Sequence, residues 1–482
     1  MRNQIKIDYI VDIVAEVATG PLMTVVYEGT YAPLQFQGLS KSGSKKVLIK
    51  KINSRILSNK VDWETLRYLD HPNVASYTFI SQKSRLFSSQ TYIVQDYCQN
   101  TLQQLGSLFQ SNWLSSGVVK NAVKEIAAGL TYLHGKSIVH RNLKPSNILI
   151  KPPLDNPSRF IITDFWYTNV RAVPKNNSAC CCFKTQVPDN TEIVQWMAPE
   201  LLNDDSKTTS PMMDMYSFGR ILEYLFCQGP LPLCKVDSFL FRLLIQETVR
   251  LTPSSRITSR AVLEKHPLVI VPAHKNVTVT ADIRIDYIRE GYDRIIKLIG
   301  NESDRVDMIQ LMESKIRSIT VNGSLIFPWS GSDEHGSFSH RMYTEMNKHT
   351  KRPYNDNSFL DLLRMVRNFR KHPLTGEDNL DLLDEIEDDA ISKNFPYIIP
   401  FLYICLDCSL DSAFVPSPIF NRSICAEEIE KRCMAGSQVA GPVSAELERE
   451  DSGVFLMASS RGGGGPSLRR RGGGRRHKKH HP

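Results

Sequence analysis

Residues 1 to about 80 carry short runs that are rich in β-branched and aromatic residues. TVVYEGTY and KKVLIKKI are two of these runs, and TYIVQDY follows slightly later. Runs of this kind favour β-strands, and one stretch near residues 56 to 70 has helical periodicity instead. The pattern predicts a small lobe built mainly of strands.

The chain from residue 101 to about 405 has mainly helical patterning. Residues 101 to 268 are interrupted by Pro-rich and Ser-rich stretches, which predict loops. Helical periodicity continues over 283 to 320, where Gly300 breaks it, and over 358 to about 405. The low-complexity end, SSRGGGGPSLRRRGGGRRHKKHHP, predicts a disordered tail.

The segment YNDNSFLDLLRMVRNFRKHP, residues 354 to 373, separates apolar from polar positions clearly. On a helix, one stripe is apolar and the opposite stripe is polar, with Arg367 at its flank. The apolar stripe contains Phe359, Leu362, Leu363, Val366 and Phe369, and the polar stripe contains Asp361, Arg364, Asn368 and His372. We expect one face to pack and the other to present reactive side chains.

Two polar residues of this segment lie near the predicted helix ends. Ser358 and Asp361 fit a capping box, so Asp361 either begins the helix or belongs to a reactive site. Pro373 disfavours helical geometry at His372 and so places it at the helix C-terminus, where the macrodipole favours imidazolium. That protonation state suits a general acid.

Length and charge set the broad class. A chain of 482 residues with 41% hydrophobic composition suits two or three domains. The formal charge is +8, but residues 452 to 482 hold eight Lys/Arg and no acid, so the remainder carries 8 − 8 = 0. Any nucleic-acid binding by the folded part must use local patches. The tail either attracts nucleic acid by its charge or is simply solvated.

The length of the apolar runs and the spacing of the cysteines indicate the cellular compartment. No stretch approaches the roughly 20 apolar residues of a membrane span, so we expect a soluble cytoplasmic or nuclear protein. The ten cysteines form no regular disulfide framework. Cys405 and Cys408 form a single CxxC, for which a buried helix end is favoured over zinc.

Four motifs occur in the order and at the separations of a protein kinase. They are HRNLKPSNILI (140 to 150), TDFW (163 to 166), WMAPE (196 to 200) and DMYSFGR (214 to 220). Together they resemble the protein-kinase fold. The resemblance implies nucleotide binding by Lys50, Gly20, Lys144, Asn147 and Asp164, with magnesium held by Asn147 and Asp164. It also implies a structural ion pair between Glu200 and Arg256.

Three departures from the kinase pattern indicate lost catalysis. Asn142 replaces the catalytic-loop aspartate, and a neutral amide cannot accept the substrate proton. The Gly-rich loop keeps Gly20 but has Ala18 and Met23 at other glycine positions, and Trp166 replaces the glycine after TDF. We expect a pseudokinase that binds ATP or ADP with magnesium; the alternatives are an empty scaffold and a weakly active serine/threonine kinase.

The helical block behind the kinase motifs resembles a kinase-extension nuclease (KEN) domain. The resemblance rests on Trp329, on the spacing of the residues from Tyr354 to His372, and on FPYIIPFLY at 395 to 403. It points to the kinase/endoribonuclease family that includes the unfolded-protein-response inositol-requiring enzyme and RNase L. The residues implied as catalytic are His372, Arg367, Asn368, Tyr354 and Asp361. Trp329 either stacks on a base or packs in the core, and packing is favoured.

These residue types suit RNA cleavage without a metal. The reaction needs a base for the 2′-hydroxyl proton, a cation for the phosphate charge and an acid for the leaving oxygen. His372 is the natural acid, and Arg367 offers a fork complementary to phosphate. Asn368 can orient the phosphate or a hydroxyl. The resemblance gives Tyr354 the role of base or 2′-hydroxyl partner.

The sequence therefore predicts an α+β bilobal protein-kinase fold over 1–270, an all-α KEN-type nuclease domain over 283–408, and a disordered basic tail over 409–482. The predicted function is metal-independent RNA cleavage regulated by nucleotide binding and dimerisation. The expected partners are RNA and a second copy of the chain or a relative, with no membrane. The alternative is a non-catalytic adaptor that modulates a related kinase/RNase.

Overall fold

The computed structural model describes most of the chain up to residue 406. His372, Trp166, Cys408 and the basic tail lie outside the described residues. The described residues are 4–7, 9–20, 24–33, 45–53, 63–85, 88–98, 100–106, 116–151, 159–165, 195–202, 210–227, 231, 233–271, 277–301, 310, 313, 320–321, 324–325, 328–330, 336–348, 350–369, 380–387 and 389–406.

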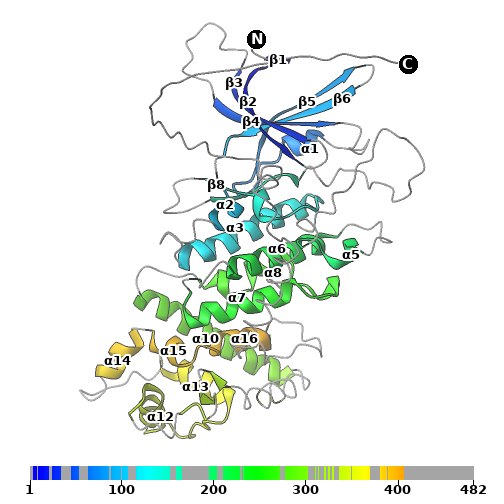
Figure 1. Cartoon of the computed structure of the whole chain (residues 1–482). Coiled ribbons are helices and arrows are strands. Elements are labelled where there is room, and N and C mark those ends of the chain that lie inside the picture. Colours follow the sequence, from blue (N-terminus) through cyan, green and yellow to red (C-terminus); the bar gives the residue numbers. More distant parts are fainter. Residues whose placement is uncertain are drawn as a thin grey trace, which may run out of the picture.

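An antiparallel sheet of six strands forms the N-terminal lobe, at the top of Figure 1. Its order is β1-β2-β3-β4-β6-β5, and β4 is buried on both faces, which explains the continuous apolar run around Leu48. A short helix, α1 (Trp63–Arg67), lies in the stretch expected to be helical. The strands are β1 (Gln4–Ile7), β2 (Tyr9–Gly20), β3 (Thr24–Pro33), β4 (Lys45–Asn53), β5 (Tyr77–Arg85) and β6 (Ser88–Asp96). The predicted strand-rich lobe is confirmed.

The second lobe is mainly helical and is centred on α3 (Ser116–Gly135). Val119, Val123, Ile126 and Leu130 are fully or almost fully buried, and their spacing of three and four residues places them on one face of α3. A small antiparallel sheet, β7-β8-β9, lies at the top of this lobe. The other elements are β7 (Asn100–Thr101), β8 (Ile148–Lys151), β9 (Arg159–Ile162), α2 (Leu102–Gly106), α5 (Pro199–Leu202), α6 (Pro211–Cys227), α7 (Lys235–Thr248), α8 (Ser259–Glu264) and α9 (Pro267–Ile270).

A third, helical region follows at the lower end of Figure 1. Its helices are α10 (Val277–Asn301), α12 (Phe338–Lys348), α13 (Phe359–Phe369), α14 (Leu380–Glu387), α15 (Ala390–Asn394) and α16 (Ile398–Leu406), with a small hairpin of β10 (Thr320–Val321) and β11 (Ser324–Leu325). All nine residues of α16 are buried, as FPYIIPFLY suggests. The predicted fold, a bilobal kinase followed by helices, is confirmed.

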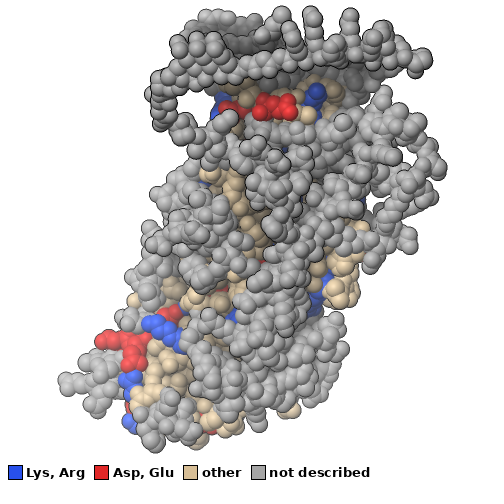
Figure 2. Space-filling view, in the orientation of Figure 1, with Lys and Arg blue, Asp and Glu red and all other residues tan. Residues whose placement is uncertain are grey.

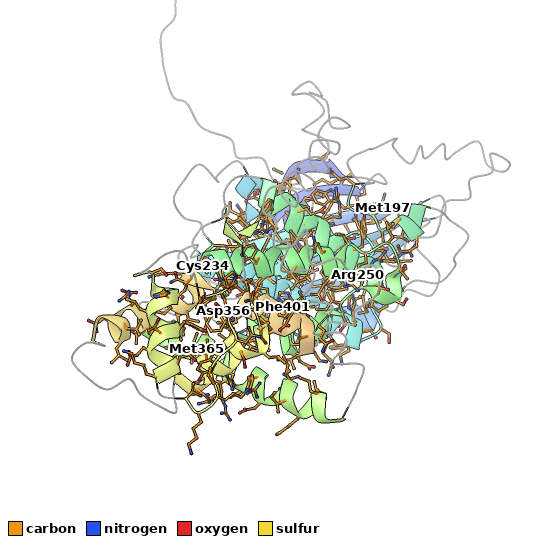
Figure 3. All side chains as sticks on the ribbon, turned by 90° about the horizontal axis from the view of Figure 1, so that it is seen from below. Met197, Cys234, Arg250, Asp356, Met365 and Phe401 are labelled. Atoms are coloured by element: carbon orange, nitrogen blue, oxygen red, sulfur yellow. The ribbon has the colours of Figure 1, made fainter. Side chains whose placement is uncertain are left out.

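The C-terminal helices pack directly on the second lobe. One continuous hydrophobic cluster contains residues of α7, α10 and α16. α10 and α16 approach closely at Gly291, where a Cβ would lie 2.5 Å from Leu402 Cδ2. Figure 3, seen from below, shows Phe401 of α16 between the kinase helices and the other C-terminal helices. The two regions therefore share a core.

A buried ion network crosses the same junction. Arg284 of α10 binds the carboxylate of Asp389, and its other contacts are Asp237 Oδ2 at 3.6 Å and Cys234 Sγ at 3.3 Å. Asp237 also pairs with Lys120 Nζ of α3 at 3.1 Å. Pairing of this kind is what allows charges to be buried.

Two further features concern the charge of the surface and the apolarity of the helices. On the face in Figure 2, acidic and basic side chains lie together at the end of the molecule where α12 and α14 lie, and Arg341 of α12 pairs with Glu385 of α14. Among the described residues, no helix is both long and apolar enough to cross a membrane.

Candidate functional site

The kinase-like catalytic loop is held by Asp214 of α6. Its carboxylate accepts the backbone N–H groups of His140 and Arg141, each at 2.8 Å, and contacts the His134 ring at 2.8 Å. Arg141 has φ of 64°, an unfavourable conformation that this pairing maintains. Burial lowers the pKa of His140, so its ring is neutral. The loop geometry is thus fixed independently of residue 142.

Three of the residues expected to bind nucleotide and magnesium have their contacts in and next to this loop. Lys50 of β4 forms an ion pair with Asp164, and both side chains are largely buried. Asn147 donates its Nδ2–H to the backbone oxygen of Asn142 at 2.7 Å. The carboxylate of Asp164 and the amide of Asn147 are the oxygen donors that magnesium takes. These residues fit a magnesium nucleotide.

The remaining expected kinase residues lie at the end of β2, in the catalytic loop and in the turn that follows it. Gly20 ends β2 opposite Thr24 of β3, and Lys144 immediately precedes the single turn at Pro145–Asn147. Asn142 occupies the loop with its backbone N–H donating to His140 Nδ1 at 3.3 Å. Its neutral amide does not fit the role of a proton acceptor. The structure keeps the binding groups and lacks the base at this position.

The predicted structural ion pair is confirmed. Arg256 donates both terminal nitrogens to the Glu200 carboxylate at 2.6 and 2.8 Å. Burial opposes ionisation of Glu200, but the Arg256 hydrogen bonds prevail and its pKa is lowered. This pair ties α5 to the segment after α7.

Helix α13 carries the predicted apolar stripe. Phe359, Leu362, Leu363 and Val366 are fully buried, and Phe369 is nearly so. Asp361 differs from the expectation of an exposed polar face, since only 7% of it is exposed. The loop before the helix covers it: Asp361 Oδ2 accepts the backbone N–H of Asn355 at 2.8 Å. The Asp361 N–H donates to Ser358 Oγ at 3.4 Å, so Ser358 caps the helix, while the Asp361 carboxylate holds the preceding loop.

Three of the expected nuclease residues are joined by hydrogen bonds. Tyr354, which is 3% exposed, accepts at its hydroxyl the Asn368 Nδ2–H at 3.0 Å. Asn368 Oδ1 accepts Arg367 Nη1–H at 3.0 Å. Tyr354 comes from the loop and the other two from α13, so the helix and its preceding loop together fix a phenol, an amide and a guanidinium in one row.

Arg364 holds the loop on which Tyr354 lies. Its Nη2 donates to the backbone oxygens of Arg352 and Pro353 at 3.1 and 3.0 Å. Its guanidinium lies 4.4 Å from the centroid of the Tyr354 ring, a cation–π contact. Asp361 Oδ1 lies 3.2 Å from Arg364 Nε. Arg364 therefore packs Tyr354 against α13.

Helix α10 brings two further residues to Arg367. Asp293 Oδ1 lies 3.3 Å from Arg367 Nη2, and the Tyr292 ring centroid lies 5.7 Å from the guanidinium carbon. Burial raises the pKa of Tyr292 although Arg364 and Arg367 oppose the rise. The sequence patterns did not predict either residue, because contact between α10 and α13 depends on helix packing. An Asp or Tyr on a helix carries no local signal of such a contact.

Trp329 has a structural position. It is buried, its Nε1–H donates to the Ser358 oxygen at 3.0 Å, and its ring packs edge-on against Tyr343 and Phe395. The packing alternative is confirmed. His372 lies outside the described residues, three positions beyond the end of α13 at Phe369.

Comparison with known proteins gives matches over the kinase-like region alone and matches over most of the chain. Residues 25–252 match the protein kinase domain family. The serine/threonine-protein kinase/endoribonuclease ire-1 of Caenorhabditis elegans is 25% identical over 82% of this chain and 39% of its own length. IRE1b of Arabidopsis thaliana, a protein of the same description, is 24% identical over 81% of the chain and 45% of its own length. The mitogen-activated protein kinase kinase kinase dlk-1 of Caenorhabditis briggsae is 31% identical over 37% of the chain. The chain spans less than half the length of these relatives.

Proposed function

We propose that this chain, which is similar over most of its length to the kinase/endoribonucleases ire-1 and IRE1b, is an RNA endonuclease whose cleavage site lies on α13 and the loop before it. The row formed by Tyr354, Asn368 and Arg367 carries this proposal. It combines a phenol, an amide and a guanidinium within hydrogen-bond reach of one another. These are groups that can bind a 2′-hydroxyl and a phosphate at neighbouring positions.

In the proposed reaction, the 2′-oxygen of the substrate attacks the adjacent phosphorus while its proton passes to a base at the Tyr354 end of the row. The bond between phosphorus and the 5′-oxygen breaks. His372 gives its proton to that leaving oxygen, so the products are a 2′,3′-cyclic phosphate and a free 5′-hydroxyl. The reaction is balanced without a water or an oxidant.

Arg367 is proposed to stabilise the charge that grows on the phosphate. Its Nη1 is held by Asn368, which in turn is held by the Tyr354 hydroxyl, so the guanidinium is oriented before substrate binds. The cation supplies the charge stabilisation that a metal gives in other nucleases. We therefore propose cleavage that needs no metal. Asp361 is assigned to positioning, through Asn355 and Arg364.

The kinase-like region is proposed to act as a nucleotide-controlled support. A bound ATP or ADP with magnesium would supply negative phosphates to Lys50 and a cation to Asp164, separating the pair that they form. Such a ligand favours one conformation when its contacts differ between conformations. The shared core with α10 and α16 then carries the change to the nuclease helices, and two copies of the chain associate. We propose three divisions of the chain: a kinase-like domain over 1–270, a nuclease domain over 283–408 and a basic tail over 409–482.

The direct test is cleavage of a fluorescent single-stranded RNA by the full chain. We expect cleavage that rises more than linearly with protein concentration, persists in EDTA without nucleotide, and yields a 2′,3′-cyclic phosphate by mass spectrometry. The His372→Ala variant removes the acid and should reduce the rate about 100-fold or more. Folded protein that cuts under no condition would replace this proposal with a non-catalytic adaptor.

A further inference from the structure

The side-on edge of the Arg367 guanidinium is only half satisfied. This edge consists of Nε and Nη2, the pair that holds two oxygens of one carboxylate or phosphate. Asp293 Oδ1 contacts Nη2 at 3.3 Å. Nε is buried and has no hydrogen-bond partner among the described residues. A buried donor without a partner is costly, so this edge is suited to a ligand with two adjacent oxygens.

Asp293 holds its position weakly. Its side chain is 50% exposed and that of Arg367 is 25% exposed, and the nitrogen–oxygen contact between them is 3.3 Å long. Exposed ion pairs of this type contribute little to stability because water and salt screen them. The Asp293 carboxylate therefore covers part of the Arg367 edge without being firmly attached to it.

Resting on the proposed function, we propose that Asp293 is a specificity-determining residue that competes with the substrate phosphate for Arg367. In the free protein its carboxylate takes the place of one phosphate oxygen on Nη2. An RNA phosphate displaces it and binds both Nε and Nη2, while Nη1 stays on Asn368. Each productive encounter must exchange one anion for another on the same cation. A polyanion of closely spaced phosphates makes this exchange, and an isolated carboxylate has no advantage over Asp293.

Competition between Asp293 and the phosphate for Arg367 should lower the affinity of the wild-type protein for RNA and make that affinity less dependent on salt. Removing the carboxylate charge in Asp293→Asn should tighten RNA binding by about two- to fivefold, because an exposed charge contact is lost from the free protein only. The logarithmic salt slope should steepen by up to about 0.7, the value for one phosphate on a single strand. We expect KM for cleavage to fall by a similar factor while kcat stays within about twofold.

The chain offers a matched control on the same helix. Asp286 lies two turns before Asp293 on α10, is 48% exposed, and pairs with Arg289 at 3.2 Å. Asp286→Asn makes the same change of net charge on the same face, with no contact to Arg367. It should leave both affinity and salt slope near the wild-type values. Arg367→Gln supplies a second background in which the competition cannot operate.

The experiment measures fluorescence anisotropy of a 2′-O-methyl RNA strand, which cannot be cleaved through its 2′-oxygen, bound to the full chain at several salt concentrations. Tighter binding by Asp293→Asn than by Asp286→Asn, with the gain abolished in the Asp293→Asn/Arg367→Gln double variant, supports the inference. Equal or weaker binding by Asp293→Asn overturns it, as does a gain that persists without Arg367.

Cleavage measured on the same variants separates this inference from the proposed function. Tighter binding in a protein that cuts no RNA would contradict the nuclease and leave the competition intact. Cleavage by the wild type with no effect of Asp293→Asn would do the reverse. Absence of RNA binding by every variant, each shown to be folded by its thermal transition, would overturn both.

Discussion

The kinase-like and nuclease-like sites differ in the polar groups that they present. At the kinase-like site, Asp214 fixes the catalytic loop and Lys50 pairs with Asp164, yet Asn142 offers a neutral amide where a base is required. At the nuclease-like site, Tyr354, Asn368 and Arg367 present their polar groups in one connected row. Asn and Asp have nearly the same shape, so the loop can keep its backbone geometry with either residue.

The buried ion network of Arg284 joins the kinase-like region to the C-terminal helices, so its loss should destabilise the folded chain. Arg284→Met should lower the free energy of unfolding by about 3–5 kcal/mol, because Asp389 would remain buried without its cation. Arg284 contacts the Asp389 carboxylate and reaches Asp237 of the kinase region. Chemical denaturation monitored by circular dichroism provides the measurement.

Arg289→Met is the matched control for this change. Arg289 lies on the same helix, is 38% exposed and pairs with Asp286. An exposed pair contributes about 0–1 kcal/mol, so its loss should have little effect. Equal destabilisation by both variants would show that the buried network does not join the two regions.

Tyr354→Phe tests the nuclease-like site with a minimal change. The variant keeps the ring that packs on Arg364 and removes the hydroxyl that accepts from Asn368. We expect RNA cleavage to fall about 100-fold, the size of a lost acid–base group. Steady-state cleavage of labelled RNA gives kcat and KM.

Tyr343→Phe removes a comparable hydroxyl that lies outside the row. That hydroxyl donates to the Tyr354 backbone oxygen at 3.1 Å. Cleavage by this control should stay within about fivefold of wild type, as expected for one neutral hydrogen bond. Wild-type rates from Tyr354→Phe would remove the phenol from the proposed mechanism.

The pH dependence of stability should report on the junction through His266. Burial, reinforced by the Lys120 charge, lowers the pKa of His266 to about 3, and its ring packs edge-on against Tyr403 of α16. The unfolded value is about 6.5, so the stability from neutral His266 is complete above that pH and is lost as pH falls toward 3. We expect a loss of about 2 kcal/mol between pH 7 and pH 5.

Urea unfolding of wild type and His266→Asn at both pH values isolates this contribution. Asparagine can still cap α9, where His266 Nδ1 accepts the Leu268 N–H at 3.3 Å, and it does not titrate. The difference between the two proteins should shrink at the lower pH. A difference that is constant with pH would contradict the assignment.

Nucleotide affinity should show the smallest effect. Lys50→Met removes one charged partner of the phosphates and should weaken ADP binding about tenfold, the effect of a charge-assisted hydrogen bond. Lys46→Met is the control, since Lys46 lies on the same strand, is exposed and pairs with Glu28 at 2.7 Å. Calorimetric titration of both variants measures the change. Equal affinity in Lys50→Met and wild type would place nucleotide elsewhere or nowhere.

Local sequence patterns predicted the helices, the strands and their buried faces. They did not predict contacts between elements that are far apart in the sequence. The apolar stripe of α13 follows from residue spacing within one helix, and the kinase lobes follow from strand runs and motif order. The burial of Asp361 depends on a loop folding back, which spacing does not encode. The contact between Asp293 and Arg367 depends on how α10 packs beside α13, and Gly291 permits the close approach of α10 to α16.

The most direct test of the central claim is the rate of RNA cleavage by Arg367→Ala compared with Arg341→Ala. Arg341 lies on α12 in the same region and pairs with Glu385, apart from the row of Tyr354 and Asn368. The account predicts a fall of about 100- to 1000-fold for Arg367→Ala, as for loss of a group that stabilises transition-state charge, and near wild-type cleavage for Arg341→Ala. Undiminished cleavage by folded Arg367→Ala would contradict it.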